Sequence, residues 1–300
     1  MFFRSSWLLP GFNSNFIVLI PKTPNADTIT NFRPIALANF VFKIIPKLLA
    51  DRISSIASKI ISPNQTAFVK GRKIYQSIGL ASECFNLLDN KTHGGNVALK
   101  VDIAKAFETI DWGFLLHVLD AFGFNNTFQN WVTALLKSAH LSVLINGSPF
   151  GYFSCKRGVR QGDPLSPILF CLAEEVLSRG LDWYHSKGLI NTISSPRGIS
   201  SPTHILYADD VMIFCKGNKR NLRNVMKLMK DYGEVSGQIM NNSKSQVYIG
   251  KGAAHRSHSI TSLLGMQEDK APFTYLGVPI FKGKPSKVHL QAVVDKRKSK

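Results

Sequence analysis

The stretch HILYADDVMIFC, residues 204–215, places two adjacent acids between two runs of strand-forming apolar residues. It predicts a strand, a tight turn and a second strand, with Asp209 and Asp210 at the tip. Buried carboxylates are costly unless a cation or hydrogen-bond donors pair with them. Aspartate also favours turns for local reasons, so the tetrapeptide YADD on its own is typical of turn chemistry.

A third acid lies at the end of another expected strand. In NVALKVDI, residues 96–103, every second residue is apolar, and Asp102 lies on the other face. If this strand and those around YADD are neighbours in one sheet, Asp102 and Asp209 meet at its edge. Carboxylate oxygens suit hard cations, chiefly Mg²⁺. Two such ions about 4 Å apart can activate a 3′-hydroxyl and stabilise a leaving pyrophosphate.

The composition is that of a folded, strongly basic protein. Of its 300 residues 44% are hydrophobic, and 37 Lys and Arg against 19 Asp and Glu give a net charge of +18. Such a balance favours a polyanionic partner, most often nucleic acid. No run reaches the roughly eighteen apolar residues of a membrane span, so no membrane partner is expected. The cysteines lie far apart and predict packed, reduced thiols rather than a zinc site: Cys84, Cys155, Cys171 and Cys215.

Helices and strands are mixed without strict alternation, which indicates an α+β fold. Apolar periodicity predicts helices over 38–61, 74–88, 104–122, 127–138, 164–181 and 221–235. Strands are expected over 16–20 and 245–249, with a hairpin across Asn146-Gly147. Pro46 should kink or split the first helix, and 251–270 is predicted to be a polar segment.

Several blocks accompany YADD in a fixed order. They are NFRPIALANFVFKII at 31–45, DIAKAFETIDW at 102–112 and GVRQGDPLSPILF at 158–170. Together these blocks resemble the reverse transcriptase domain of LINE-type non-LTR retrotransposons, most closely that of plant elements, and also that of group II intron proteins. The resemblance runs from IPK at 20–22 to YLGVPI at 275–280, and therefore covers nearly the whole chain.

The resemblance implies a right-hand polymerase fold, with fingers and an antiparallel palm sheet packed on helices. Residues 1–95 would form fingers that are partial at the N-terminus. Residues 96–250 would form the palm, with an inserted fingers segment, and would carry the catalytic acids. Residues 251–300 would hold the end of the palm, a primer-grip-like segment and a truncated start of the thumb. The implied activity is RNA-directed DNA polymerisation, with an RNA template, a DNA primer and dNTPs as partners.

The same resemblance assigns roles to the acids and to one aromatic residue. Asp102, Asp209 and Asp210 would bind two Mg²⁺ ions, with Mn²⁺ as a substitute, and Asp210 would make the least direct contact. Phe107 matches the steric gate that crowds a 2′-hydroxyl and so selects deoxynucleotides. Its helical spacing with Ile110 fits plain core packing equally well, and without the resemblance core packing is the favoured interpretation.

Further residues match nucleotide-binding positions of the family. Arg33 would contact the triphosphate, as a guanidinium can in bidentate fashion, although a surface arginine held by Pro34 explains it equally well. Gln161 and Gly162 match the loop beside the incoming nucleotide and template, where glycine permits close approach of the backbone. Without the resemblance, RQGDPLSP is typical of a turn that leads into a helix.

Two segments are expected to contact nucleic acid. Lys70, Arg72 and Lys73 would bind phosphates, although an exposed basic loop is usually only solvated. The second segment resembles the part of the family that steadies the primer end, and its alternative interpretation is an edge strand. It consists of Tyr275, Leu276 and Gly277.

Some features depart from the family. Glu108 stands where these elements usually carry Asp, and Pro46 replaces a residue that is commonly Ser. Whole LINE proteins also have an endonuclease and a thumb, which are expected to be missing from this chain. The alternative function is therefore an inactive or domesticated fragment that binds RNA without catalysis. An RNA-templated RNA polymerase is a weaker alternative, because Phe107 would exclude ribonucleotides.

Overall fold

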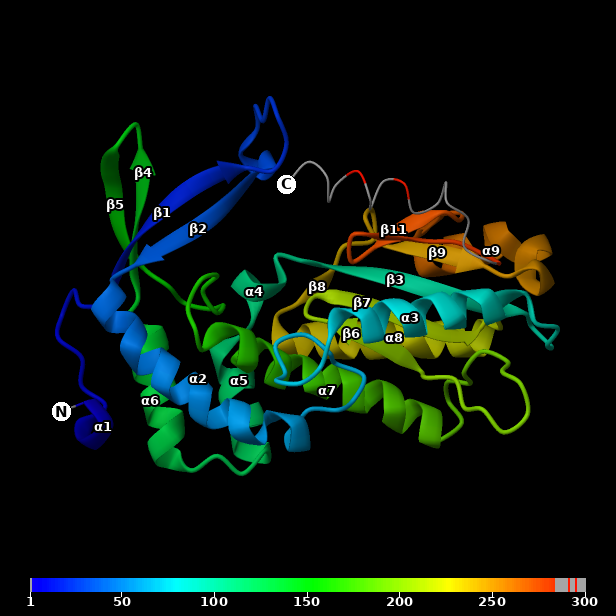
Figure 1. Ribbon diagram of the computed structural model, residues 1–300, viewed down its shortest axis with the longest axis horizontal. Coiled ribbons are helices and arrows are strands. Elements are labelled where there is room, and N and C mark those ends of the chain that lie inside the picture. The colour runs from blue at the N-terminus through cyan, green and yellow to red at the C-terminus, as the bar shows by residue number, and fades with distance from the viewer. Residues whose placement is uncertain (1, 284–290, 292–294, 296–300) are drawn as a thin grey trace. The chain divides into compact units, whose positions relative to one another are not determined.

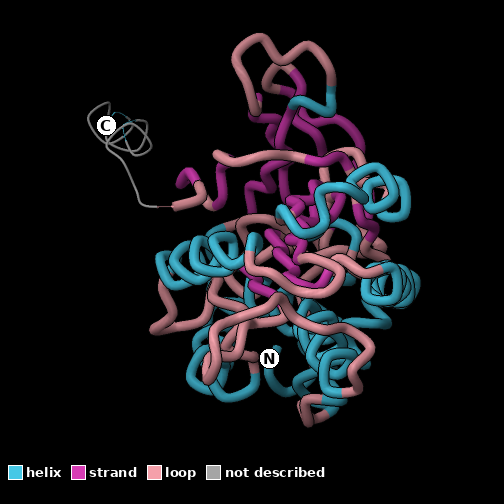
Figure 2. The backbone as a smooth tube through the Cα atoms, turned by 90° about the vertical axis from the view of Figure 1, so that its right-hand side faces the viewer, coloured by secondary structure: helices cyan, strands magenta, loops and turns pink. Residues whose placement is uncertain are grey.

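The computed structural model describes residues 2–283, 291 and 295. Helices and strands are both abundant, as the colours of Figure 2 show. The first of two compact units comprises the described residues of 1–60, 105–173 and 235–237, and the second those of 61–104, 174–234 and 238–300. The expected fingers segment, 1–95, is thus shared between the units, and most of the expected start of the thumb lies outside the described residues.

The first unit contains a four-stranded sheet in the order β2-β1-β4-β5. Its strands are β1 (Ser14–Pro21), β2 (Phe32–Ala38), β4 (His140–Ile145) and β5 (Ser148–Ser154). The predicted hairpin across Asn146-Gly147 is confirmed, and both turn residues have positive φ. Strand β2 was not expected, because Pro34 and the helical periodicity that follows it hid a strand that pairs with β1 from Asn15 to Pro21.

The first unit also contains helices, which are in chain order α1, α2, α4, α5, α6 and the start of α7. Their bounds are Phe2–Ser5, Phe40–Ile60, Ala106–Thr109, Trp112–Ala121, Asn126–Lys137 and Ser166–Ser186, and a short 3₁₀ helix covers Ile29–Asn31. Helix α2 continues through Pro46 without the expected split. The single helix expected over 104–122 is two helices, because the Asp111 side chain accepts a hydrogen bond from Phe114 N and caps α5.

The segment GVRQGDPLSP is held in the first unit by a buried ion pair. Arg160 Nη2 lies 3.0 Å from Asp163 Oδ2, and the guanidinium also lies over the ring of Phe42. Burial lowers the pKa of Arg160 and raises that of Asp163, while each charge opposes the shift of the other. Gly158 lies so close to Glu108 that a Cβ would be 2.5 Å from its carbonyl oxygen. This close approach fixes the loop that carries Gln161.

The second unit is built on a six-stranded sheet in the order β10-β9-β3-β7-β6, with β8 paired to the end of β3. The strands are β3 (Asn96–Ala104), β6 (His204–Tyr207), β7 (Asp210–Lys216), β8 (Ile239–Met240), β9 (Gln246–Ile249) and β10 (Gln267–Glu268). Strands β3 and β7 are antiparallel neighbours (Figure 1). The predicted pairing of the two acid-bearing stretches is therefore confirmed.

The helices of the second unit match most of the predicted ones. They are α3 (Ile74–Asn86), the rest of α7, α8 (Lys219–Ser236) and α9 (Ser257–Leu264), with 3₁₀ helices over Leu87–Asp89 and Lys251–Arg256. The segment 251–270 was expected to be only polar, yet it contains a 3₁₀ helix, α9 and β10. In the described residues no helix has both the length and the apolar character needed to span a bilayer.

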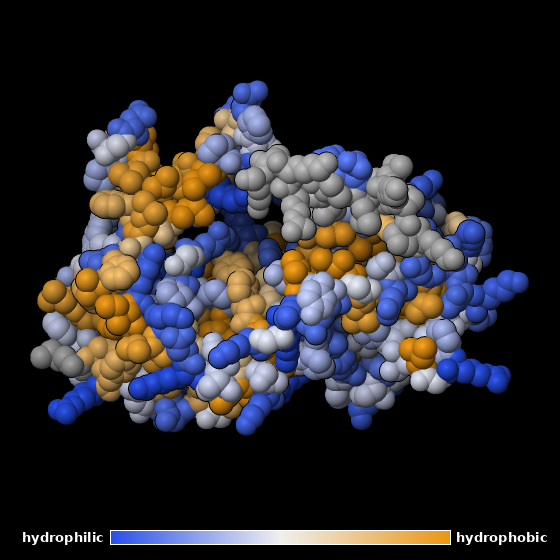
Figure 3. Space-filling view, in the orientation of Figure 1, coloured by the Kyte–Doolittle hydropathy of each residue, from blue (hydrophilic) through white to orange (hydrophobic). Residues whose placement is uncertain are grey.

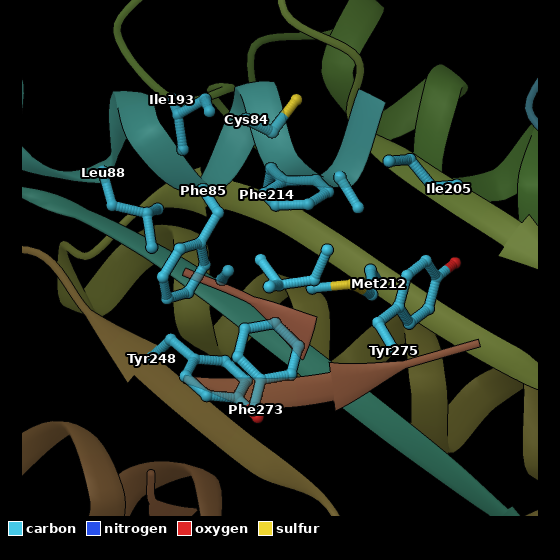
Figure 4. Packing of buried hydrophobic residues seen from close by; sticks show 13 residues of the cluster. Cys84, Phe85, Leu88, Ile193, Ile205, Met212, Phe214, Tyr248, Phe273 and Tyr275 are labelled. Atoms are coloured by element: carbon cyan, nitrogen blue, oxygen red, sulfur yellow. The ribbon is translucent and has the colours of Figure 1, made fainter. Parts of the chain in front are cut away.

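A cluster of thirteen buried residues packs between α3, the sheet and a small hairpin (Figure 4). The hairpin consists of β11 (Phe273–Tyr275) and β12 (Val278–Ile280). The ring of Phe273 stacks on Tyr248 at a centroid distance of 4.1 Å. Ala98 belongs to this cluster, so the face of β3 that was expected to be the less apolar one is also covered. Towards Lys100 and Asp102 the same face becomes only half-buried.

Candidate functional site

The three acids come together at one end of the sheet in the second unit. Asp102 on β3 lies directly opposite Asp210 on β7, and Tyr207 on β6 pairs with Asp210 from the other side. Asp209 therefore lies in a two-residue turn with Ala208, whose φ of 53° is in the left-handed region. The backbone thus brings all three acid-bearing residues to the same edge, as the sequence predicted.

The electrostatics of this edge disfavour ionised acids. Crowding by neighbouring atoms withdraws water from Asp209 and raises its pKa, and the charge of Asp102 adds to the shift, whereas a hydrogen bond to its own backbone opposes it. Partial burial raises the pKa of Asp210, and the charges of Asp209 and Asp102 raise it further. Lys100 opposes this second shift. Negative charge at this edge is therefore only partly compensated.

The turn is held from outside by the segment SPNQTAF, residues 62–68. The Gln65 side chain is 1% exposed, and its Oε1 accepts hydrogen bonds from Ala208 N at 3.1 Å and Ala67 N at 3.0 Å. Leu206 N donates to Asn64 O, and Thr66 N donates to Leu206 O. Gln65 is therefore a positioning residue for the YADD turn.

The end of β3 is held in a similar way by the segment SGQIMNNSKS, residues 236–245. Asp102 N donates to Ser245 Oγ at 3.0 Å, and the Ser245 hydroxyl donates to Asn241 O at 2.8 Å. Asn241 N in turn donates to Asp102 O at 2.8 Å. These contacts fix the backbone from which the Asp102 carboxylate projects.

A fourth acid, Glu174 on α7, is fully buried near the turn. Its Oε1 accepts a hydrogen bond from the Tyr232 hydroxyl at 3.2 Å, and Oε2 has no hydrogen-bond partner within the described part of the chain. Burial raises the pKa of Glu174 to about 8, and the charge of Asp209 adds to the shift, whereas the hydrogen bonds to Tyr232 and Gln238 oppose it. Glu174 is therefore a neutral acid at neutral pH.

The acids do not form a closed set of ligands. Within residues 2–283 and the two described positions beyond them, no group of three or more His, Cys, Asp or Glu side chains is placed to hold a metal ion. The predicted metal-binding roles of Asp102, Asp209 and Asp210 thus rest on the convergence of their strands.

The expected nucleotide-binding residues Phe107, Gln161 and Gly162 lie in the first unit. The ring of Phe107 stacks on buried Phe170, with centroids 4.2 Å apart and an interplanar angle of 5°. Gln161 Nε2 donates to Glu108 Oε1 at 2.7 Å. Gly162 has a φ of 95°, a conformation that favours glycine. The stacked ring is consistent with both a gate and core packing.

A pocket of about 180 Å³ lies beside these residues within the first unit. Its lining includes Gln161, Glu108 and Trp112, together with Pro34 and Ala36 of β2. Successive strand residues point to opposite faces, so Arg33, which is exposed, projects from the face of β2 away from this pocket. Gln161 and Arg33 are therefore not brought to one pocket, and the predicted triphosphate contact of Arg33 stays a prediction.

The residues expected to contact nucleic acid differ in their surroundings. Lys70 and Lys73 are exposed, whereas the Arg72 guanidinium donates to the carbonyl oxygens of Ile61, Ser62 and Gln65. Arg72 thereby satisfies carbonyl groups just beyond the C-terminus of α2, which is a structural role.

The segment Tyr275-Leu276-Gly277 turns between β11 and β12. The ring of Tyr275 is 1% exposed, so solvent reaches this segment at Leu276 and Gly277. The edge-strand interpretation is close to what is found, since β11 and β12 form a separate two-stranded sheet.

Comparison with known families decides the identity of the chain. A family described as "Reverse transcriptase (RNA-dependent DNA polymerase)" matches residues 20–280. The chain belongs to the reverse transcriptase family. The matched residues include the sheet edge with Asp102, Asp209 and Asp210, the segment 62–68 that contains Gln65, and Phe107.

Two relatives place this reverse transcriptase domain among mobile elements. The "Transposon TX1 uncharacterized 149 kDa protein" of Xenopus laevis is 30% identical over 231 residues, which are 76% of this chain and 17% of that protein. The R2 retrotransposable-element polyprotein of Popillia japonica is 25% identical over 229 residues, 76% of this chain and 31% of that protein. The chain thus spans less than a third of either relative. The retrotransposon resemblance is confirmed, and the closer likeness to plant elements stays a prediction.

Solved structures support the fold. Apo telomerase of Candida tropicalis matches with a TM-score of 0.58 at 14% identity, over 90% of this chain and 47% of that chain. The same telomerase with a fragment of telomeric RNA gives 0.56 at 13% identity, over 97% of this chain and 49% of that chain. The expected right-hand polymerase fold of the α+β class is confirmed.

Sequence reasoning missed three residues of this reverse transcriptase domain. Glu174 is hidden in the apolar helix α7, Gln65 in a loop without regular structure, and Glu108 was noted only as a departure from the family. The one available signal was a pair of acids inside an apolar helix, Glu174 and Glu175.

Proposed function

We propose that the chain is an RNA-directed DNA polymerase domain that adds deoxynucleotides to the 3′-hydroxyl of a primer on an RNA template. The observation that carries this proposal is the register of β3 and β7, which sets Asp102 opposite Asp210 with Asp209 in the adjoining turn. All three acids lie in the segment 96–250 that we assign to the palm. Residues 1–95 are assigned to the fingers, and 251–300 to the end of the palm and the start of a thumb.

The residues at this edge fit a divalent cation. The family consists of metal-dependent polymerases, and the donors here are carboxylate oxygens, which hard cations prefer. Burial raises the pKa of Asp209 and Asp210, repulsion by the neighbouring acids adds to both shifts, and a bound cation would relieve that repulsion. We assign Asp102 and Asp209 as the direct ligands and Asp210 as the assisting one. When bound, two Mg²⁺ ions, or Mn²⁺ in their place, would activate the primer hydroxyl and stabilise the departing pyrophosphate.

Nucleotide selection is assigned to the first unit. Phe107, held flat against Phe170, would present a rigid ring edge to the sugar and so exclude a 2′-hydroxyl. Gln161, oriented by its hydrogen bond to Glu108, would contact the incoming nucleotide, and Gly162 would let the backbone approach it. Arg33, exposed on β2, would reach the triphosphate.

Binding of the template and primer is assigned to exposed basic and turn residues. The net charge of +18 favours a polyanion in general. Lys70 and Lys73 would contact phosphates, and Leu276 and Gly277 would lie beside the primer end, because these residues are open to solvent. Arg72 would support this loop from within through its bonds to carbonyl groups.

Primer extension on an RNA template with Mg²⁺ tests the proposed function. The wild-type chain should incorporate dNTPs, and Asp209→Ala should abolish incorporation. Asp231→Ala is the matched control, because Asp231 is an exposed acid on α8 outside the catalytic edge. Equal incorporation by the wild type and Asp209→Ala contradicts the proposal. RNA binding without any extension by the wild type supports the alternative, a fragment that binds RNA without catalysis.

A further inference from the structure

Tyr275 has a buried hydroxyl group that forms no hydrogen bond with any residue that the structure describes. Its side chain is 1% exposed, and its ring belongs to the buried cluster that includes Met212 and Phe273. Figure 4 shows the hydroxyl directed away from the rings of Phe273 and Tyr248. An unsatisfied buried hydroxyl destabilises the folded chain, so a tyrosine here needs a reason that a phenylalanine would not supply.

The hydroxyl is directed towards the catalytic edge. Along β7, Phe214, Met212 and Asp210 share one face because alternate strand residues point the same way. In Figure 4 the step from Phe214 to Met212 leads towards Tyr275. The strand register makes Asp210 the next residue on that face. The hairpin is tied to the same face, since Lys100 Nζ donates to Thr274 O at 3.2 Å.

Electrostatics agree with this placement. Burial raises the pKa of Tyr275, and the charge of Asp210 raises it further. The phenol is therefore protonated throughout the physiological range and can only donate to a carboxylate. Asp210 is half-buried, and Lys100 is the cation that opposes the rise in its pKa. A neutral hydrogen-bond donor beside Asp210 would stabilise its charged form.

The turn that follows Tyr275 fixes where the hydroxyl lies. Leu276 has a φ of 49° and Gly277 a φ of 80°, so both turn residues are in the left-handed region. This conformation is unfavourable for a residue such as leucine, whose Cβ approaches the following carbonyl oxygen. Leu276 packs against the same buried cluster, which compensates for that cost. The end of β11 is thus held in one position.

We propose that Tyr275 is a positioning residue for Asp210: its hydroxyl donates a hydrogen bond to the Asp210 carboxylate when the cation and substrate engage the site. The proposal rests on the proposed function. The resemblance implied that Tyr275 contacts nucleic acid. We instead assign its hydroxyl to the orientation of Asp210. The chemical basis is complementary. Among the described residues, the buried Tyr275 hydroxyl has no acceptor and the Asp210 carboxylate has no hydrogen-bond donor.

A pair of tyrosine substitutions tests the proposal. Tyr275→Phe keeps the ring in the core and removes only the unsatisfied hydroxyl, so the unfolding temperature should stay the same or rise. The kcat for dNTP addition should fall about 10- to 100-fold with little change in the KM for dNTP, and the Mg²⁺ concentration for half-maximal rate should rise. A tyrosine that serves only as core predicts unchanged kcat and unchanged Mg²⁺ dependence.

Tyr248→Phe is the matched control in the same cluster. The Tyr248 hydroxyl has two acceptors within reach, Gln246 Oε1 at 3.0 Å and Asp269 Oδ2 at 3.1 Å, and neither belongs to the catalytic edge. This variant should therefore lose stability and keep the kcat of the wild type. If both variants behave alike in kcat, the proposal is overturned.

A readout without turnover separates this proposal from the proposed function. Mg²⁺ that binds the folded chain raises its unfolding temperature, and Tyr275→Phe should reduce that rise, whereas Tyr248→Phe should not. Absence of primer extension in the wild type overturns the proposed function alone. An equal Mg²⁺-induced rise in the wild type and Tyr275→Phe, or no rise in the wild type, overturns the role of Tyr275.

Discussion

Two hairpins of this chain have turns of the same length, two residues, but the residues in the turns differ in how well they tolerate positive φ. The β4–β5 hairpin turns through Asn146-Gly147, the pair that two-residue turns with positive φ prefer. The β6–β7 hairpin turns through Ala208-Asp209, and Ala208 takes a φ of 53° without being Gly, Asn or Asp. The first turn therefore follows local preference, and the second is imposed on the chain by its surroundings.

Their surroundings explain the difference. All residues of β5 are exposed, and Figure 3 shows apolar surface over the β1, β2, β4 and β5 region. The β6–β7 turn is instead held by Gln65, while the charges of Asp102 and Asp209 raise the pKa of Asp210. In the β4–β5 turn the residues prefer the conformation that they adopt, so the turn needs no support from other parts of the chain. In the β6–β7 turn, strain and repulsion are maintained by neighbours, which is the pattern expected at a functional site.

Exchanging the turns gives the largest expected effect. Replacing Ala208-Asp209 by Asn-Gly should raise the free energy of unfolding by about 1 kcal/mol, because it relieves strain and removes one of the repelling charges. Primer extension should fall by roughly 10³-fold, since a carboxylate of the reacting centre is lost. Urea unfolding and single-nucleotide incorporation measure the two effects.

Ala208→Gly is the control for that exchange. It relieves the backbone strain and keeps Asp209, so stability should rise and activity should remain within a few-fold of the wild type. If the Asn-Gly variant retains full activity, the contrast between the two hairpins has no functional meaning.

The second effect concerns the buried acid beside the strained turn. The pKa of Glu174 is raised from 4.5 to about 8 on folding. Between these values the unfolded chain loses the proton and the folded chain keeps it, so stability falls as pH rises through this window. Glu174→Gln removes the loss. Relative to the wild type, its free energy of unfolding should rise by roughly 2–4 kcal/mol from about pH 5 to about pH 8.

Urea unfolding at several pH values measures this difference. Glu234→Gln is the control, because Glu234 is an exposed acid on α8, and its difference from the wild type should hardly vary with pH. The raised pKa values of Asp209 and Asp210 act in the same direction in both proteins and cancel in the comparison. A flat difference for Glu174→Gln would mean that the acid is ionised when folded.

The third effect lies outside both hairpins and should change selectivity rather than stability or rate. Phe107→Val shortens the ring that stacks on Phe170 and opens space beside the sugar. Discrimination against ribonucleotides should fall by about 10- to 100-fold, as expected for a missing apolar contact in a pocket. Competition between dNTPs and rNTPs in primer extension measures it. Phe107→Tyr keeps the ring and should preserve discrimination, and unchanged discrimination in both variants would leave Phe107 as core.

The sequence predicted the parts of the fold in which local and tertiary signals agree. The strand-turn-strand at YADD, the Asn146-Gly147 hairpin and helix α3 are confirmed, because apolar period and turn chemistry point to the same structure. Strand β2 was missed because Pro34 argues against a strand, and its position at the edge of the sheet tolerates proline. The break before α5 was missed because apolar spacing continues through Asp111, and only its capping bond shows the new start.

The candidate site was predictable only as far as its acids. The alternation in β3 and the turn at Asp209 place the carboxylates, since the pairing of two strands follows from their apolar faces. Gln65 and Glu174 could not be found, because they contact the turn through the tertiary fold and no local pattern marks them. Tyr275 is singled out by its burial and by a hydroxyl without a hydrogen-bond partner among the described residues, and neither property can be predicted from the sequence.

The smallest effect comes from the reciprocal exchange in the first unit. Replacing Asn146-Gly147 by Ala-Asp puts two less tolerant residues at φ values of 49° and 81°. The free energy of unfolding should fall by about 1–2 kcal/mol, because both residues then adopt the left-handed region without the help that Gln65 gives Ala208. Urea unfolding measures the loss, and the kcat for dNTP addition should not change. If the exchange leaves the free energy of unfolding unchanged, a positive φ at Ala208 is not a sign of strain. The functional interpretation of the β6–β7 turn then depends on its charges alone.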